Sequence, residues 1–157
     1  MKKIYLTLSL VIMMFVPSIT FGNVIDKLNE AGKFNKLNET LSKSGLNENL
    51  KGAGPFTVFA PLDDAFAAIS AKTYFGLLRD ENKDKLVNIL GRHVFSKKIT
   101  SSEIDGEIKL KAINGEEITI KKVNGIVYIN EAEVVTADVE VSNGVIHYIN
   151  RVLQPLK

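Results

Sequence analysis

The spacing of hydrophobic residues changes once along the chain, near residue 92, and this change most constrains the fold. Before it, apolar residues recur at helical intervals, as in Val24, Ile25 and Leu28. After it, short apolar runs are separated by the dipeptides most typical of tight turns, at residues 105–106, 114–115, 124–125 and 143–144. Helices followed by hairpin-linked strands predict an α+β domain, with short helices packed along one side of an antiparallel sheet system.

The first half of the chain predicts several short helices and one strand. Gly32 and Gly45 are positioned as the stops of two helices. A glycine-rich loop then leads into an apolar strand at residues 56–59, after which Asp63 or Asp64 is expected to cap a further helix. Two more helices are expected at residues 74–78 and 82–91.

Two hairpins of the second half can be predicted to the residue. A two-residue turn at residues 124–125 pairs Ile120 with Ile129 on one buried face. A three-residue loop at residues 113–115, with its glycine in the left-handed conformation, places Leu110 opposite Ile118.

The N-terminus has the three-part layout of a secretory signal. Two lysines precede an apolar run of 13 residues, and a cleavage-like pattern of small residues ends at Gly22. That run is shorter than the roughly 20 residues that a membrane-spanning helix needs. We therefore expect residues 1–22 to be a cleaved signal peptide and residues 23–157 to form one domain, secreted or periplasmic, without stable membrane insertion after cleavage.

Charge and composition exclude several classes of partner. Without its first 22 residues the chain carries 18 basic and 18 acidic side chains. Such a neutral domain lacks the basic surface that neutralises phosphates, so nucleic acid is not an expected partner. There is no cysteine and there are two histidines, which lie 54 residues apart without metal-ligand spacing. We expect neither a metal nor a cofactor.

No catalytic constellation can be assembled from this chain. Asp63 and Asp64 are adjacent carboxylates, but they follow Pro61 and precede an Ala-Phe run, as expected at a helix start. Ser101 and Ser102 lack the motif that surrounds a nucleophilic serine, and no glycine-rich phosphate loop precedes a helix. The sequence therefore predicts a protein that is not an enzyme.

Two stretches resemble the signature blocks of the fasciclin domain family. Residues 56–66 (FTVFAPLDDAF) are similar to its first block, and residues 134–155 (VVTADVEVSNGVIHYINRVLQP) to its second. Between them, residues 86–94 (LVNILGRHV) occupy the position of the family's tyrosine-histidine segment, with His93 retained and Arg92 where an aromatic residue is usual. The resemblance covers about residues 23–156 and implies a wedge-shaped antiparallel β-sandwich flanked by helices.

This resemblance implies an exported adhesion or interaction module that binds a protein or polysaccharide, at the cell envelope or outside the cell. The alternative is an extracytoplasmic binding protein for an apolar small molecule, which needs a cavity between the helices and the sheet. Six aromatic residues could either line such a cavity or form the core: Phe34, Phe56, Phe59, Phe66, Tyr74 and Phe75.

Five polar residues are the candidates for binding contacts: Asp64, Arg92, His93, Asn143 and His147. Each also has a structural interpretation. His93 lies at a helix-to-strand junction, where a buried imidazole is commonly hydrogen-bonded. If residues 143–144 form a two-residue turn, Glu140 lies opposite His147, as either a fold-stabilising pair or a pH-sensitive surface contact.

Overall fold

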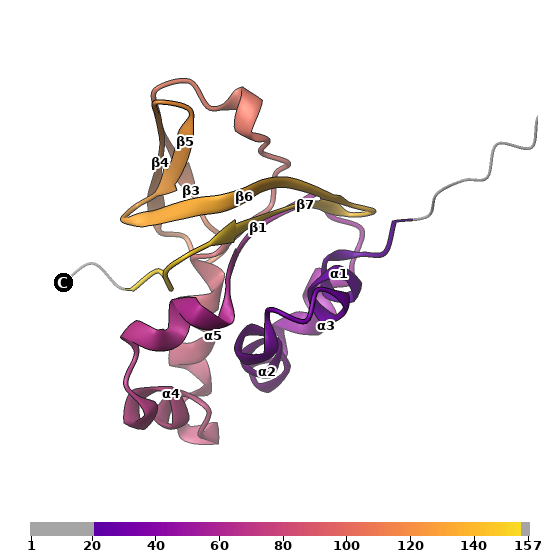
Figure 1. Ribbon diagram of the computed structural model, residues 1–157. Helices are drawn as coiled ribbons and strands as arrows, with labels where there is room; N and C mark the ends of the chain where they lie inside the picture. The colour runs from indigo at the N-terminus through magenta and orange to yellow at the C-terminus, as the bar shows by residue number, and fades with distance from the viewer. Residues whose placement is uncertain (1–20, 155–157) are drawn as a thin grey trace, which may run out of the picture.

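The computed structural model describes residues 21–154, so most of the expected signal segment, residues 1–20, lies outside the described residues (Figure 1). The helices of the first half are α1 (Val24–Glu30), α2 (Asn35–Ser44), α3 (Leu46–Leu50), η1 (Asp63–Ala68), α4 (Ala71–Leu77), η2 (Asp80–Asn82) and α5 (Lys83–Gly91). The strands are β1 (Phe56–Pro61), β2 (Val94–Phe95), β3 (Glu107–Lys111), β4 (Glu117–Val123), β5 (Ile126–Ile129), β6 (Ala132–Val141) and β7 (Gly144–Ile149), with the short helix η3 (Ser101–Glu103) between β2 and β3. Among the described residues no helix is both long and apolar enough to cross a bilayer.

The first two helices begin and end where the sequence signals are strongest. The Asn23 side chain accepts a hydrogen bond from the Asp26 N–H, and the Asp26 carboxylate accepts one from the Asn23 N–H, both at 3.0 Å. This reciprocal capping box starts α1. Helix α2 ends at Gly45, whose φ of 80° lies in the left-handed region that glycine adopts without a steric cost.

The expectation that Asp63 or Asp64 caps the helix that follows them is wrong. Helix η1 begins after Leu62 and has no side-chain cap. The Asp63 carboxylate instead accepts hydrogen bonds from the Lys36 N–H and the Asn35 amide, both at 2.9 Å. Asp63 therefore caps the start of α2, a helix about 27 residues earlier in the chain.

The seven strands form one sheet in the order β2-β1-β7-β6-β5-β4-β3. Strands β1 and β7 run parallel and the other neighbours antiparallel, so the expectation of a purely antiparallel system is wrong at this one pairing. The Ile113 N–H, just after β3, donates to the Val94 carbonyl of β2 at 2.9 Å and so links the two ends of the sheet. The sheet is nearly closed and barrel-like, which corrects the expected sandwich, whereas the α+β class is confirmed.

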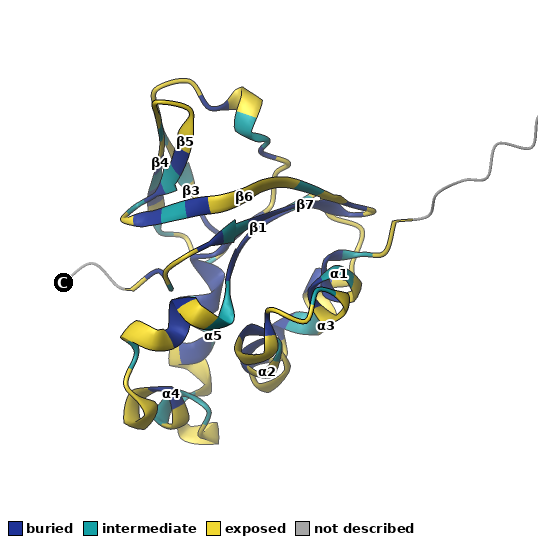
Figure 2. Ribbon diagram, viewed as in Figure 1, coloured by how far each residue is buried: buried dark blue, intermediate teal, exposed yellow. Residues whose placement is uncertain are grey.

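Strand β1 separates two hydrophobic cores because its successive side chains point to opposite faces. Val58 and Ala60 pack with helices of the first half, and α1 to α5 lie on one side of β1 and β7 in Figure 1. Phe59 points the other way, into the barrel, with Ile120 and Ile129. Figure 2 shows β7 as an almost continuously buried ribbon between these two cores. Strands buried on both faces form the centre of the molecule.

Both hairpins predicted to the residue are confirmed. Ile120 pairs with Ile129 across β4 and β5, and Asn124 at the turn has a φ of 51°. Leu110 pairs with Ile118 across β3 and β4, and the loop glycine between them has a positive φ.

The third hairpin differs from its expected register. Gly144 does not lie in the turn but begins β7, where it pairs with Val141, so Glu140 lies opposite Val145 rather than opposite His147. The reason is the parallel neighbour: a Cβ at Gly144 would lie 1.8 Å from the Phe56 carbonyl oxygen, so glycine is required in the strand itself. A register shift between Thr136 and Val139 then bulges β6.

Candidate functional site

The structure buries four of the five candidate binding residues. The exposed fraction is 5% for Arg92, 2% for His93, 8% for Asn143 and 1% for His147. Asp64, in contrast, is exposed on η1. The four buried residues come from the end of α5, the β6–β7 turn and the middle of β7, and each has its own set of partners. The five residues therefore do not form one cluster.

Asn143 ties three distant segments together. Its side-chain oxygen accepts from the Val24 N–H at 3.0 Å, and its amide nitrogen donates to the carbonyls of Leu50 at 2.7 Å and Gly52 at 2.8 Å. The amide thereby satisfies backbone groups at the start of α1 and at the end of α3, where helices leave such groups without partners.

His93 joins α5 to the segment after β7. Its Nδ1 lies 2.8 Å from the Ile89 carbonyl, and its Nε2 accepts from the Leu153 N–H at 2.9 Å. A proton on Nδ1 satisfies both bonds, which defines a neutral ring. Burial lowers the pKa of His93 to about 4, so the ring is uncharged at neutral pH.

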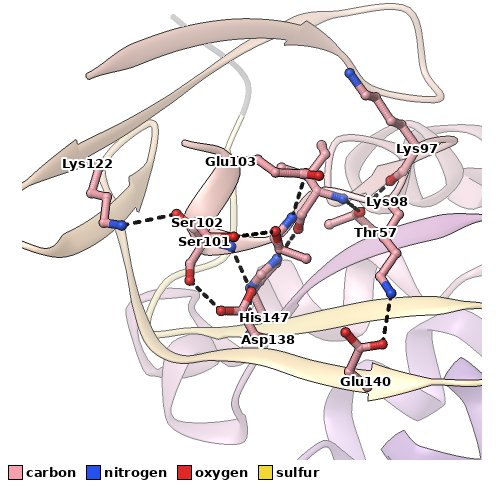
Figure 3. Close-up of polar contacts among 12 residues, drawn as sticks. Thr57, Lys97, Lys98, Ser101, Ser102, Glu103, Lys122, Asp138, Glu140 and His147 are labelled. Carbon is pink, nitrogen blue, oxygen red and sulfur yellow. Dashed lines mark hydrogen bonds and ion pairs between the residues drawn. The ribbon is translucent and has the colours of Figure 1, made fainter. Parts of the chain in front are cut away.

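His147 lies at the centre of a polar cluster beneath the β2–β3 loop (Figure 3). Its Nδ1 accepts from the Asp138 N–H at 3.1 Å, its Nε2 lies 2.7 Å from the Ile99 carbonyl, and its ring stacks on Phe59 with 5.0 Å between centroids. Burial lowers the pKa of His147, although the Ile99 carbonyl and the Asp138 carboxylate, 3.9 Å away, oppose that shift. The ring is a neutral bridge between β7, the β6 bulge and the loop.

The same cluster anchors the loop at further points. The Ser101 N–H and hydroxyl both donate to the Asp138 carboxylate. Burial raises the pKa of this carboxyl, but the two bonds together with the attraction of His147 and Lys122 bring the pKa below its usual value. The Thr57 hydroxyl of β1 donates to the Lys97 carbonyl and accepts from the Ile99 N–H at 2.8 Å. Together these contacts fix the loop backbone.

Ser101, Asp138 and His147 do not form a catalytic triad, although all three residue types are present. The serine hydroxyl donates to the aspartate, and both histidine nitrogens bond to backbone groups. A serine nucleophile needs an imidazole nitrogen in position to take its proton. In this cluster the imidazole has neither nitrogen free, so the arrangement holds a loop in place.

Arg92 forms a bidentate ion pair with Glu116. Its Nε and Nη2 donate to the two carboxylate oxygens at 2.5 and 2.6 Å, and this pairing lowers the pKa of Glu116. Within residues 21–154 the buried Nη1 has no hydrogen-bond partner. The pair joins the end of α5 to the β3–β4 loop, at the position where the resemblance places an aromatic residue.

An apolar cavity of about 120 Å³ lies among η1, α4, α5 and the segment after β7. Its walls include Ile69, Leu77, Leu86 and Leu90, with His93 among the lining residues. Of the six aromatic residues expected at such a cavity, Phe66 and Tyr74 line it. Four do not: Phe34 and Phe59 are fully buried in the cores, Phe56 is partly buried, and Phe75 is exposed.

The cavity adjoins an open groove of about 1100 Å³, and the two share wall residues Ile69, Thr73, Val152 and Gln154. The groove residues come from three parts of the chain: residues 64–73, residues 130–132 after β5 and residues 150–154 after β7. Asp64 and His93 are the two sequence candidates along this connected hollow. Sequence reasoning missed the other residues that line the cavity and the groove, because no local motif links the three segments.

Four polar side chains of the groove have free hydrogen-bonding groups. Within the described part of the chain, no hydrogen bond or ion pair involves the side chains of Asp64, Glu131, Arg151 and Gln154. These groups contrast with the buried polar residues above, whose donors and acceptors, apart from Nη1 of Arg92, bond to this chain. Free polar groups beside an apolar cavity are typical of a binding surface.

Comparison with known proteins identifies the family. The model of the Fasciclin domain matches residues 32–155. "Protein sll1483" of Synechocystis is 51% identical over 107 residues, and transforming growth factor-beta-induced protein ig-h3 of Sus scrofa is 35% identical over 134 residues. These alignments cover 68% and 85% of this chain, and they span 58% and 19% of those relatives.

The fold has a solved counterpart. A FAS1 domain pair from the insect cell adhesion molecule fasciclin I matches with a TM-score of 0.76 and 22% sequence identity, over 87% of this chain and 52% of that one. The structural match shows a shared fold, and the family model covers more than half of the sequence. This chain therefore belongs to the fasciclin domain family.

Proposed function

We propose that this protein is an exported, non-enzymatic interaction module that binds a protein or a polysaccharide at the cell envelope or outside the cell. The observation that carries the proposal is the groove, which free charged and amide groups line and which adjoins an apolar cavity. The family supports it, since the solved domain pair comes from a cell adhesion molecule. The absence of enzymatic activity is supported by the buried histidines, whose ring nitrogens are bonded to backbone.

Among the candidate residues, we assign a direct binding contact to Asp64 alone. It is exposed and lies on the groove. The other four, Arg92, His93, Asn143 and His147, act through the stability of the fold, because each is buried and makes at least two hydrogen bonds within this chain. Variants of these four residues are expected to lose stability and binding in parallel, whereas an Asp64 variant loses binding alone.

In-cell photocrosslinking tests the groove as the binding site. A benzophenone amino acid replaces Ala67, an exposed groove residue, and in a matched control it replaces Lys111, an exposed residue of β3 outside the groove. We expect covalent adducts from position 67 and none from position 111 in cells that naturally export the protein. Adducts from position 111 with none from position 67 would move the site elsewhere, and no adduct from either position would contradict the proposal.

Export has its own test. The proposal includes cleavage after Gly22, on the basis of the lysines and the apolar run that precede it. The intact mass of protein recovered from the extracytoplasmic fraction should correspond to a chain that begins at Asn23. Recovery of the full-length chain from the cytoplasm would refute export.

The second candidate function is an extracytoplasmic carrier for an apolar small molecule, which the apolar walls of the cavity favour. The cavity of about 120 Å³ is smaller than the roughly 300–1,000 Å³ of typical ligand pockets, which ranks this function second. Native mass spectrometry of gently purified protein separates the two functions. A bound molecule of discrete mass would favour the carrier, and a clean apo mass would favour the interaction module.

A further inference from the structure

We propose that the partner is an extended peptide segment of another protein, with one large apolar side chain seated in the cavity and a basic side chain beside Asp64 and Glu131. This inference rests on the proposed function and names the class of partner for the same groove. It excludes polysaccharide as the primary partner.

The size of the cavity matches a single side chain. A cavity of roughly 150 Å³ lined by aliphatic groups holds one benzene molecule, so a cavity of about 120 Å³ accommodates one aliphatic side chain, such as that of leucine. The walls are apolar, and His93 adds no charge at neutral pH because burial lowers its pKa to about 4. Burial of such an anchor in water-excluding walls supplies the hydrophobic part of the affinity.

The shape of the hollow matches a chain that continues on both sides of the anchor. The cavity and the groove share four wall residues, Ile69, Thr73, Val152 and Gln154. A side chain seated in the cavity therefore connects directly to the groove. The groove is several times larger than the cavity and is open, as required for flanking residues. A compact apolar molecule would fill the cavity and leave the groove without a role.

The charges of the groove select a basic neighbour for the anchor. Asp64 and Glu131 both lie along it without an ion-pair partner among residues 21–154, whereas Arg151 is the one basic residue of the lining. A lysine or arginine next to the apolar anchor complements this excess of carboxylate. The groove lining contains no aromatic ring on which a sugar could stack, which disfavours a polysaccharide.

Selection from a library of random displayed peptides tests the inference. The purified protein is the bait, and synthetic versions of enriched peptides are measured by fluorescence anisotropy. We expect a shared pattern of one large apolar residue with lysine or arginine within two positions. Replacement of the apolar residue by alanine should weaken binding at least about tenfold, which corresponds to the burial of one anchor side chain.

Matched variants of the protein assign the binding to the groove. Thr73→Phe narrows the mouth of the cavity and should weaken binding at least about tenfold, whereas Lys72→Phe adds the same ring one position away, outside both linings. Asp64→Lys should weaken basic peptides about three- to tenfold, whereas Asp80→Lys, an exposed carboxylate of η2 outside the groove, should not. All four positions are exposed, so these variants are expected to fold.

Two outcomes would overturn the inference. One is a set of selected peptides without an apolar anchor, and the other is binding that Thr73→Phe leaves unchanged. The crosslinks at position 67 test the proposed function separately. A glycan adduct at that position, without any peptide that binds in the groove, would refute the peptide partner but retain the interaction module. The absence of both adduct and peptide refutes both.

Discussion

Two buried imidazole rings hold backbone segments together, and both rings are neutral when they do so. His93 accepts from the Leu153 N–H, and His147 accepts from the Asp138 N–H. Protonation would place a second N–H against each of these donors. Burial accordingly lowers the pKa of both histidines, that of His93 to about 4.

The first prediction concerns pH. The unfolded chain binds a proton at each histidine near the ordinary pKa of 6.5, whereas folded His93 remains neutral down to about pH 4. The contribution of these histidines to the free energy of unfolding is therefore fully present above about pH 6.5. Below that pH it decreases by about 1.4 kcal/mol per pH unit for each fully shifted histidine. Urea unfolding across this range should show the decline, and His93→Gln should reduce its slope. An unchanged slope in that variant would contradict the assignment.

Asn143 gives the second prediction. Asn143→Asp keeps an oxygen that can accept from Val24 but removes the amide donor to the Leu50 and Gly52 carbonyls, and it places a negative charge against them. We expect a loss of about 3 kcal/mol or more in the free energy of unfolding. Asn49→Asp, at an exposed site, is the control and should change stability by less than about 0.5 kcal/mol. Equal effects of the two substitutions would refute a special role for the buried amide.

At the scale of single elements, two glycines predict opposite results for the same substitution. Gly144→Ala forces a Cβ against the Phe56 carbonyl and separates β1 from β7, so we expect a loss of more than about 3 kcal/mol. Gly76→Ala lies in α4 with open space around the new Cβ, so a gain of about 0.5–1 kcal/mol is expected. Thermal melts of both variants check the pair, and destabilisation by Gly76→Ala would contradict the helix argument.

The adjacent aspartates provide a further pair. Asp63→Ala removes the cap of α2 and should cost about 1 kcal/mol, whereas Asp64→Ala should leave the free energy of unfolding nearly unchanged. Chemical denaturation measures both values. The same Asp64→Ala variant should weaken partner binding, so the two aspartates separate stability from recognition. A stability loss at Asp64 as large as that at Asp63 would rule out this division.

Elements whose signals are local could be predicted from the sequence, and elements fixed by distant neighbours could not. The turn at Asn124 and the alternation of β4 lie within one short segment, which is why the pairing of Ile120 with Ile129 was predicted. The conformation of Gly144 depends instead on Phe56, in a strand from the first half of the chain. Likewise, Asp63 caps a helix that precedes it, where a sequence pattern predicts a cap for the helix that follows.

At the scale of the whole molecule, the Arg92–Glu116 pair joins the helical half to the strand half. Arg92 is 5% exposed, so removal of its partner leaves a buried charge. We expect Glu116→Ala to cost about 2–3 kcal/mol, and Arg92→Met combined with Glu116→Leu to recover most of that loss. A double-mutant cycle by urea unfolding measures the coupling, and a coupling of zero would show that the pair contributes nothing.

The candidate site could be predicted only in part for the same physical reason. Asp64 was identified because it is polar and lies in a recognisable motif, but Glu131 and Arg151 follow two different strands and line the same groove only in the folded sheet. The sandwich was implied by the family resemblance, and strand alternation could not correct it because alternation is the same in a sandwich and a barrel. The contact that links the two ends of the sheet, the hydrogen bond from Ile113 to Val94, joins distant segments and is encoded by no periodic pattern.

The Asn143 amide holds the Val24 backbone, which lies 119 residues earlier, and the parallel partner of β1 is the last strand of the sheet. As the chain leaves the ribosome, β1 can pair only with the two-residue strand β2 until residues 144–149 have been made. Such distant pairings slow folding, because a long loop must close before any contact stabilises it. The sheet therefore cannot form in its native order before β7 has been made.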